Sequence, residues 1–573
     1  MHRDRITKNY SAQKNIQVSG QMSIRGIVVE DIDEAEVKEA LMEMKGAISA
    51  LAVSGYASVR NPAHELRIKE IAGEILGVPV VCGHELTSVL GYDERTVTAV
   101  LNASLMPEIA DLVKEIKRIL VEMHIQTKVM IVKGDGSLMS SDFAEMRPID
   151  TVMSGPAASV IGAATMTDNQ NAIVVDIGGT TTDIAGIHSG SVSVKEEGAI
   201  VGGWQTRARA VYMQTHGLGG DSYLQLAGDY GIRFGPKRVM PICAAAERYP
   251  YLSEELENVL GEPSFPDYEL YPYDCYCLMK QPCSADLGPV DELILNELSA
   301  GAHTAYYLGD KVGKHPRHIR FKRLVQDGYI QKISLTPTDL LHATGEYIRW
   351  DAGASRKAIE VAAASAEEIR LTSEKFIVKA KELFVRQLAF CMAKSVITFD
   401  DGQNDNVDLF LRKAIYEEPD SRLKLDLTCS VPVIGLGAPA AAWLPKACQI
   451  LHSELILAEN YEVANALGAA AAEIRIMMEV LIRFYPTEHN FMVYYRGGCK
   501  SFFDLKDALG FARATARTSC EKIAHKEKLE EYDISMEEES SWIGNDHEMD
   551  TNLTEYKIMA TLIGKTNCIK IED

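Results

Sequence analysis

No stretch of about 18 uncharged apolar residues, the length that a membrane-spanning helix needs, occurs in this sequence of 573 residues. The opening Met1-His2-Arg3-Asp4-Arg5 is not followed by the apolar segment of a secretory signal. We therefore expect a protein without a membrane partner and without a secretory signal.

The sequence also lacks an excess of basic residues, because 59 basic residues stand against 81 acidic ones and the formal net charge is −22. A general nucleic-acid-binding protein needs a basic surface, so this class is excluded, and a solvated acidic surface is expected instead. The 11 cysteines are too widely spread for a secreted disulfide framework, which favours a reducing, cytoplasmic compartment. Cys275, Cys277 and Cys283 do not have the spacing of known zinc motifs, so ordinary thiols are favoured over a metal site.

The length of the chain exceeds what one hydrophobic core supports, so two to four domains are expected. We predict a first α/β lobe over residues 1–165 and a second over residues 166–490. A mainly helical insertion at about 240–430 interrupts the second lobe, and a small mixed module follows at 491–573.

Apolar runs and helical periodicity predict the elements of the first lobe. Residues 47–53 and 79–82 are typical of strands, and residues 62–76 between them have helical spacing, which together predict a parallel βαβ unit. Residues 106–123 predict a long amphipathic helix, and residues 128–132 predict a strand.

The clearest chemical motif is DIGGTTTD at residues 176–183, which follows the apolar strand predicted at residues 172–175. Glycines without a Cβ allow close backbone approach, and successive N–H groups and hydroxyls can surround an anion. This assigns phosphate contacts to a short series of residues: Gly178, Gly179, Thr180, Thr181 and Thr182. Asp176 and Asp183 are placed to hold a hydrated Mg²⁺ that bridges phosphate oxygens. A plain hairpin turn is the alternative.

Four further glycine- or alanine-rich segments have both a structural and a functional interpretation. Residues 216–222 (HGLGGDS) predict a second glycine turn. It either places Gly219, Gly220 and Asp221 at the ligand or is a plain surface turn. His216, which precedes it, could meet the reacting group. Residues 431–434 predict a strand, followed by a turn at Gly435-Leu436-Gly437 that is a weak nucleotide signal alone. The small-residue segments at 154–164 and 461–470 predict closely packed helices.

The order of these segments resembles the second half of the actin-like ATPase superfold, which has a ribonuclease H-like duplication of α/β lobes. That resemblance implies a nucleotide cleft, with DIGGTTTD as the phosphate loop of the second lobe. It also implies that Gly435 and Gly437 border the adenosine and that the two small-residue helices cross at a hinge.

Within that superfold, the sequence resembles the hydantoinase/oxoprolinase family, in its hydantoinase A form. The resemblance rests on VMSGPAASVIGAA at 152–164, VVDIGGTTTDIA at 174–185, the GLGGD turn and TPTDLLHATG at 336–345. It implies an ATP- and magnesium-dependent hydrolase that opens a small cyclic amide of the hydantoin or 5-oxoproline type after phosphorylation of the amide oxygen. Asp176, Asp183 and His216 are then the expected catalytic residues, and relatives that carboxylate ketones leave a carboxylase as an alternative.

One feature departs from the family pattern, because no glycine-threonine loop precedes residue 178. The first lobe is therefore expected to be incomplete. A shortened chain, a non-catalytic nucleotide-binding or assembly subunit, or a chain completed by a partner subunit or homo-oligomer would each explain the departure.

Weaker candidates lie elsewhere in the sequence. The turn at 133–137 (KGDGS) could line the cleft or merely end a strand. Asp339 and His342 could serve a metal or substrate, or cap and pack a helix that begins near Thr336 or Thr338.

Overall fold

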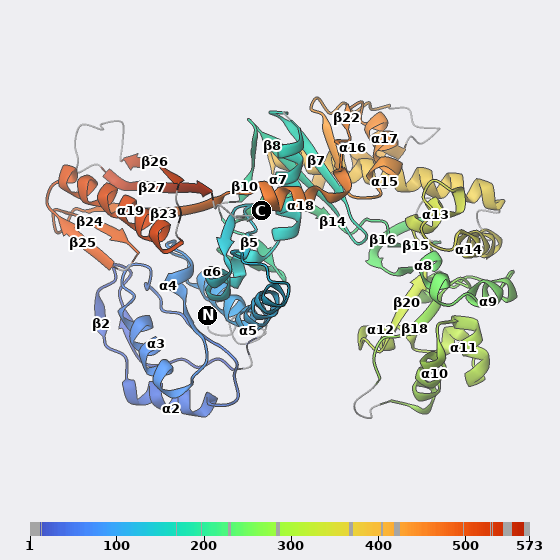
Figure 1. The fold of residues 1–573 in the computed structure, drawn as a ribbon, viewed down its shortest axis with the longest axis horizontal. Helices are drawn as coiled ribbons and strands as arrows, with labels where there is room; N and C mark the ends of the chain where they lie inside the picture. Colours follow the sequence, from blue (N-terminus) through green and yellow to red (C-terminus); the bar gives the residue numbers. More distant parts are fainter. Residues whose placement is uncertain are drawn as a thin grey trace. The chain divides into compact units, whose positions relative to one another are not determined.

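The computed structural model describes residue 12 and residues 14–167, 169–195, 197–226, 231–281, 287–365, 371–402, 405–416, 424–496, 498–527, 529, 531–542 and 553–565. The chain divides into two compact units (Figure 1). Unit 1 comprises Met1–Gly162, Val194–Tyr212 and Asn465–Asp573, and unit 2 comprises Ala163–Ser193 and Met213–Ala464. Within the described ranges, every helix is too short or too polar to cross a membrane.

Unit 1 begins with a parallel βαβ unit, as the sequence predicts. Strands β3 (Leu51–Val53) and β4 (Val80–Cys82) pair in parallel, and helix α3 (Ala63–Ile75) connects them. Helix α2 (Glu34–Met44) packs on α3 and starts at Asp33, whose carboxylate accepts the N–H groups of Ala35 and Glu36.

The next helix of unit 1 is longer than its sequence pattern predicts. Helix α5 spans Tyr92–Glu122, so the expected start at residue 106 is wrong. Asp93 and Glu94 occupy its first turn, where negative charge is favourable, and Pro107 is accommodated inside the helix. Val97 and Ala99, before Pro107, are already buried by the helix. Proline usually interrupts a helix, so the sequence pattern does not indicate that the helix continues through Pro107.

The C-terminal part of unit 1 is an antiparallel sheet covered by one helix. Its strands lie in the order β25-β24-β23-β27-β26, with bounds Gly498–Phe502, Asn490–Tyr495, Ile474–Tyr485, Leu553–Lys565 and Glu531–Trp542. Helix α19 (Leu505–Glu527) places a buried row of small side chains on this sheet at a spacing of four residues: Ala508, Ala512, Ala516, Cys520 and Ala524. Figure 1 shows this helix along the red and orange strands.

A short hairpin joins that sheet to the rest of unit 1. Strand β5 (Met130–Val132) pairs with β6 (Leu138–Ser140), and β6 meets β23 in parallel at Leu138 and Ile474. The N–H of Leu138 donates to the carbonyl of Glu473 at 2.8 Å. The sheet therefore joins residues that are more than 300 positions apart in the sequence.

The main sheet of unit 2 has the order β14-β8-β7-β21-β22. The strands are Met213–His216, Thr182–His188, Ala172–Ile177, Val433–Leu436 and Leu455–Ile456, and β9 (Ser191–Val192) pairs with β8. Strand β7 is parallel to β21 and antiparallel to β8. Val174 and Val175 at its centre are fully buried, as expected for a central strand that is covered on both faces.

Helices cover this sheet and form most of residues 240–430. Helices α15 (Ser373–Asp401) and α17 (Ala440–Ile450) pack together, with the rings of Phe384 and Trp443 4.5 Å apart. The other helices there are α8 (Ile242–Arg248), α9 (Leu252–Asn258), α10 (Pro289–Ala300), α11 (Ala305–Val312), α12 (Phe321–Gln326), α13 (Pro337–Thr344), α14 (Ala352–Ser365) and α16 (Asp408–Tyr416).

Two small sheets accompany these helices. One has the order β17-β20-β18-β19, with bounds Met240–Pro241, Ile330–Ser334, Cys275–Leu278 and His303–Thr304. The other is the hairpin of β15 (Ser222–Gln225) and β16 (Arg233–Arg238). The region is thus helical in the main, with strands that the sequence pattern did not predict.

The two small-residue helices make a backbone contact. In unit 1, a Cβ added to Gly468 of α18 (Ala464–Ala471) would lie 1.8 Å from the carbonyl oxygen of Ala158 in α7 (Ser154–Met166). Only glycine allows this approach, which explains why both segments are rich in small residues.

Candidate functional site

The predicted phosphate loop is the turn between β7 and β8 in unit 2. Asp176 lies directly opposite Asp183 in the ladder, and Ile177 lies opposite Thr182. The N–H of Gly178 donates to the carbonyl of Thr181 at 2.9 Å and closes the turn. Gly179 and Thr180 at its tip are exposed, so their peptide groups are open to a ligand.

The GLGGD turn packs on this loop through backbone hydrogen bonds. The N–H of Gly220 donates to the carbonyl of Gly178 at 3.0 Å, and that of Asp221 donates to Gly179 at 2.7 Å. A Cβ on Gly219 would lie 2.6 Å and 2.7 Å from the same two carbonyl oxygens. The two glycine-rich turns therefore form one rigid structure that has no room for larger side chains.

The third predicted turn meets the loop from the neighbouring strand, with one correction. Gly435 and Leu436 belong to β21, so the turn predicted there begins only at Gly437. Gly437 has a φ of +86°, and a Cβ there would lie 2.9 Å from Oδ1 of Asp176. Gly435 is buried and faces Leu444, so the structure does not bring it to the loop.

A fourth segment, from helix α13, completes the cluster. The hydroxyl of Thr338 donates to the carbonyl of Gly220 at 2.8 Å, and its N–H donates to the same oxygen at 2.9 Å. Sequence reasoning missed this contact of Thr338, although the residue lies in the TPTD segment on which the family resemblance partly rests.

The two aspartates at the base of the loop repel each other. Burial raises the pKa of Asp183 most, and the charge of Asp176 raises it further. Hydrogen bonds from the hydroxyls of Thr215 and Thr181 oppose this effect, the first at 2.6 Å. A divalent cation beside these carboxylates would relieve the repulsion.

Asp221 has a related electrostatic position. Burial raises its pKa most, and the charge of Asp339 raises it further, while the ion pair with Arg238 at 3.0 Å lowers it. Asp221 therefore already has a cationic partner in Arg238.

His216 lies apart from those aspartates. It pairs with Thr182 in the β14–β8 ladder, whereas Asp183 pairs with Thr215, and neighbouring strand positions face opposite sides of the sheet. Its Nε2 lies 2.8 Å from the hydroxyl of Ser395 in α15. Burial lowers its pKa most, and the charge of Lys394 lowers it further, so the neutral imidazole is favoured.

Asp339 and His342 act as structural residues of α13. Thr336 caps the helix by accepting the N–H of Asp339, and the Asp339 carboxylate accepts the N–H of Cys243 at 2.8 Å. His342 Nδ1 lies 2.8 Å from the carbonyl of Thr338, and Nε2 accepts backbone N–H groups at 3.2 Å. The buried thiols of Cys275 and Cys277 lie in β18, and Cys283 lies outside the described residues.

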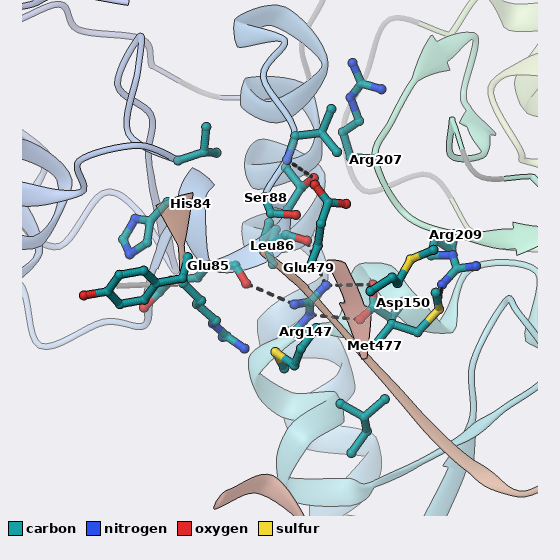
Figure 2. Close-up of a pocket in the computed structure, with 18 of the residues that line it drawn as sticks. His84, Glu85, Leu86, Ser88, Arg147, Asp150, Arg207, Arg209, Met477 and Glu479 are labelled. Carbon is teal, nitrogen blue, oxygen red and sulfur yellow. Dashed lines mark hydrogen bonds and ion pairs between the residues drawn. The ribbon is translucent and has the colours of Figure 1, made fainter. Parts of the chain in front are cut away.

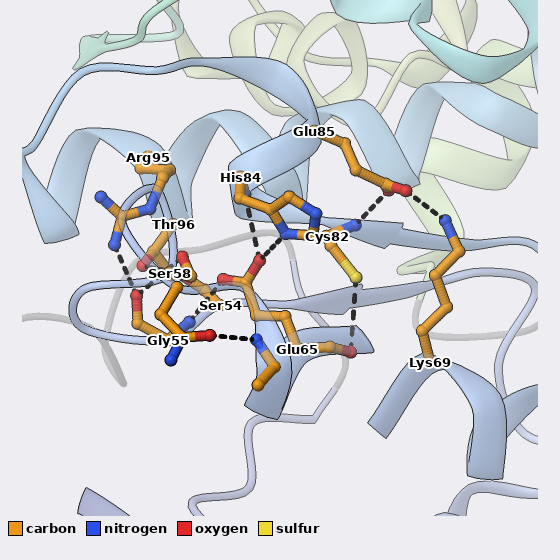
Figure 3. A network of polar contacts seen from close by, with 12 residues as sticks. Ser54, Gly55, Ser58, Glu65, Lys69, Cys82, His84, Glu85, Arg95 and Thr96 are labelled. Atoms are coloured by element: carbon orange, nitrogen blue, oxygen red, sulfur yellow. Dashed lines mark hydrogen bonds and ion pairs between the residues drawn. The ribbon is translucent and has the colours of Figure 1, made fainter. Parts of the chain in front are cut away.

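Unit 1 contains a cluster of Glu65, Cys82 and His84 whose donor atoms lie within 4.8 Å of one another (Figure 3). The Glu65 carboxylate already accepts the N–H of Gly55 at 2.6 Å, the N–H of His84 at 3.0 Å and Nδ1 of His84 at 2.6 Å. Burial raises the pKa of the Cys82 thiol far above its usual range. The saturated carboxylate and the neutral thiol indicate a structural network rather than a metal site.

Unit 1 also contains a cavity of 490 Å³ that sequence reasoning did not find as a whole (Figure 2). Its lining includes Lys133 and Asp135 of the KGDGS turn, which was the only part with a recognisable sequence signal. The remaining polar residues of the lining come from segments that are far apart in the sequence, so no local motif identifies them.

Two family models match the sequence of this chain. The one described as Hydantoinase/oxoprolinase N-terminal region matches residues 3–76, and the one described as Hydantoinase/oxoprolinase matches residues 95–248. The chain carries both regions of the hydantoinase/oxoprolinase family. The predicted resemblance to that family is confirmed.

The curated proteins to which this chain is similar are named for different reactions. The chain is 31% identical to the acetophenone carboxylase gamma subunit of Aromatoleum aromaticum over 208 residues, 34% of this chain and 28% of that one. It is 27% identical to the alpha subunit of the Pseudomonas jessenii caprolactamase over 226 residues, 38% and 32% of the two chains. It is 28% identical to the 5-oxoprolinase of Saccharomyces cerevisiae over 228 residues, which are 39% of this chain and 17% of that one. The matched segment spans less than a third of each relative.

Solved structures match over nearly the whole length of this chain. Nucleotide-free acetone carboxylase gives a TM-score of 0.58 at 15% identity and covers 97% of this chain and 70% of that one. The ATP-dependent caprolactamase of Pseudomonas jessenii gives 0.59 at 16% identity, covering 99% and 74%. These similarities establish a shared mixed α/β fold.

Proposed function

We propose that unit 2 binds ATP with a divalent cation and that the chain uses ATP to activate the carbonyl oxygen of a small amide for hydrolysis. The observation that carries this proposal is the convergence of the GLGGD turn and Gly437 on the β7–β8 loop, with Thr338 of α13 hydrogen-bonded to the GLGGD turn. Segments that are distant in the sequence thus meet at a loop whose tip is exposed, which is an arrangement suited to binding a ligand.

The residues of the loop fit a nucleotide phosphate and a cation. Gly179 and Thr180 at the tip offer backbone N–H groups without the obstruction of large side chains, and such groups bind anions. Asp176 and Asp183 offer oxygen ligands of the type that Mg²⁺ prefers. Burial raises the pKa of Asp183 most and the charge of Asp176 raises it further, and a cation would offset both effects. Bound ATP would supply the phosphoryl group that activates the amide oxygen.

The architecture that accompanies this proposal is the actin-like ATPase fold. In this interpretation unit 2 contains the second lobe, Gly437 lies toward the nucleoside, and α7 and α18 form the hinge between the lobes. The positions of Gly435 and His216 give less support to their predicted roles, because Gly435 faces Leu444 and His216 contacts Ser395.

We propose a cyclic amide of the hydantoin or 5-oxoproline type as the substrate. Caprolactamase and 5-oxoprolinase, whose names indicate cyclic amide substrates, support this class. The test is ADP release by the purified chain with a panel of hydantoins, 5-oxoproline and caprolactam. Ring opening should require ATP, and Asp183→Asn should abolish it, whereas Asp533→Asn on the exposed edge strand β26 should leave it unchanged. Ring opening without nucleotide would contradict the proposal.

A second candidate is an ATP-dependent carboxylase. The 31% identity to the acetophenone carboxylase gamma subunit favours it. Bicarbonate dependence separates the candidates: carboxylation predicts ADP release that requires both a ketone and bicarbonate, and hydrolysis predicts release that is indifferent to bicarbonate.

A third candidate is a nucleotide-binding subunit that needs a partner for catalysis. Two relatives are named as the gamma and alpha subunits of their enzymes, which favours a partner subunit. Calorimetric titration with ATP and Mg²⁺ would then show binding by this chain alone, while no amide or ketone of the panel would stimulate ADP release.

A further inference from the structure

We propose that the cavity of unit 1 binds a small organic anion, a carboxylate or phosphate ester with an apolar body, at a site separate from the loop of unit 2. The cavity measures 490 Å³, which is in the range of pockets for small ligands. Its lining combines segments of the βαβ unit, the β5–β6 hairpin and the C-terminal sheet, all within unit 1 (Figure 2).

The charge of the lining is opposite to that of the whole chain. Seven arginines and two lysines face the cavity with six carboxylates, although the chain carries a net charge of −22. Solvated acidic surfaces do not explain such a local reversal, whereas the recognition of an anion does.

Most of these cations already have carboxylate partners. Arg147 pairs with Asp150 at 2.9 Å, and Figure 2 shows its guanidinium between that carboxylate and the backbone of Glu85 and Leu86. Lys133 pairs with Asp135 at 3.2 Å. These pairs build the wall and hold its shape.

Three arginines of the lining have no carboxylate partner within the described ranges of the chain: Arg60, Arg475 and Arg496. Arg60 is 4% exposed, its guanidinium lies 5.0 Å from the ring centre of Tyr494, and its Nη2 has no hydrogen-bond partner in those ranges. The Nη1 of Arg60 donates to the carbonyl of Ile24, so no anion balances the guanidinium among the described residues, and a buried charge without a counter-charge is unfavourable.

Arg496 is a second arginine of the lining whose positive charge is not balanced in the part of the chain that the structure describes. Desolvation lowers its pKa most, and the positive charge of Arg147 lowers it further. Its side chain remains exposed, so a ligand can reach it. Two like charges close enough to perturb each other create a site that an anion stabilises.

Apolar side chains line the rest of the cavity and indicate the body of the ligand. They include Leu138, Met139, Ile476, Met478, Leu481 and Met559. Inorganic phosphate would leave this surface unused, so an anionic group attached to an apolar body fits better.

The test is calorimetric titration of the full chain with phenyl phosphate, benzoate, inorganic phosphate and neutral benzyl alcohol. Phenyl phosphate or benzoate should bind, and Arg496→Gln and Arg475→Gln should each weaken binding by about tenfold or more, the loss of a charge-assisted hydrogen bond. Arg118→Gln, on the exposed face of α5 and outside the lining, is the matched control and should bind normally.

A loop variant separates this site from the proposed nucleotide site. Gly179→Val, whose side chain would press on Asp221, should impair ATP binding and leave phenyl phosphate binding intact. Protection of Arg475 and Arg496, but not Arg118, from phenylglyoxal by bound phenyl phosphate gives a second readout without substitutions.

Several results would overturn the proposal. They are absence of binding, equal binding of benzyl alcohol, binding that Arg496→Gln and Arg475→Gln leave unchanged, or binding that disappears in Gly179→Val while that variant stays folded. If inorganic phosphate binds as tightly as phenyl phosphate, the proposal that the ligand has an apolar body is wrong.

Discussion

Asp176 and Asp183 lie directly opposite each other across the β7–β8 ladder, at the base of an exposed glycine-threonine turn. Opposed like charges destabilise a strand pair, so this arrangement lowers the stability of the empty protein. A ligand that brings a cation reverses the effect. The stability of unit 2 should therefore report on the site.

Replacing Asp183 with Asn should make the empty protein more stable. The substitution removes the repulsion from Asp176 and keeps an oxygen that accepts the hydroxyl of Thr215, so a gain of about 0.5 kcal/mol is expected. Urea denaturation measures it. The same variant should lose the thermal stabilisation that ATP with Mg²⁺ gives the wild type, and equal stabilisation of both proteins would contradict a cation site at these carboxylates.

Gly219→Ala should destabilise unit 2 by about 1–3 kcal/mol, because its Cβ would clash with two backbone carbonyl oxygens of the loop. Gly73→Ala is the control: a Cβ there meets nothing within 4 Å, and the residue lies inside α3. Alanine in a helix is favoured over glycine by up to about 1 kcal/mol, so this variant should be more stable. Chemical denaturation of both variants compares the effects.

Thr336→Ala should destabilise the protein by about 0.5–2 kcal/mol through loss of the helix cap of α13. The buried Asp339 carboxylate also loses the Thr336 hydroxyl that donates to it at 2.7 Å. Thr336→Ser keeps both contacts and should unfold near the wild-type denaturant concentration. A loss of the same size in Thr336→Ser would show that the methyl group matters instead.

His216 should make unit 2 sensitive to mild acid. Because burial lowers its pKa in the folded state, the unfolded chain binds the proton more readily, and stability falls as the pH drops below the ordinary histidine value of about 6.5. Above that pH its contribution is constant. His216→Gln should lose less stability than the wild type between pH 7.5 and pH 5.5, as measured by denaturation at each pH. Parallel curves would place the imidazole in a solvated environment.

The sequence predicts the parts of the protein whose determinants are local. The βαβ unit, the small-residue helices and the glycine turns were found because strand runs, helical spacing and Gly-Gly pairs act over a few residues. The early start of α5 was missed because Pro107 weakens its pattern. The placement of Gly435 inside β21 was missed because parallel pairing with β7 extends the strand through Leu436, opposite Asp176, and pairing partners are not visible in one segment.

The candidate sites show the same division. The DIGGTTTD loop carries its own chemistry, so its residues were named from the sequence. Arg60, Arg147 and Arg496 come together only through the folding of distant segments, and each alone is typical of a surface residue. Thr338 belonged to a recognised segment, but its bond to Gly220 depends on the tertiary fold.

Strand β23 meets β6 at Ile474 and Leu138, and β27 lies beside β23 in the same sheet. A ribosome delivers Leu138 long before either of these strands. Residues 163–464, which include all of unit 2, emerge in between. During synthesis unit 2 can therefore complete its core first, while the early part of unit 1 must wait with an unfinished sheet until its last strand leaves the exit tunnel.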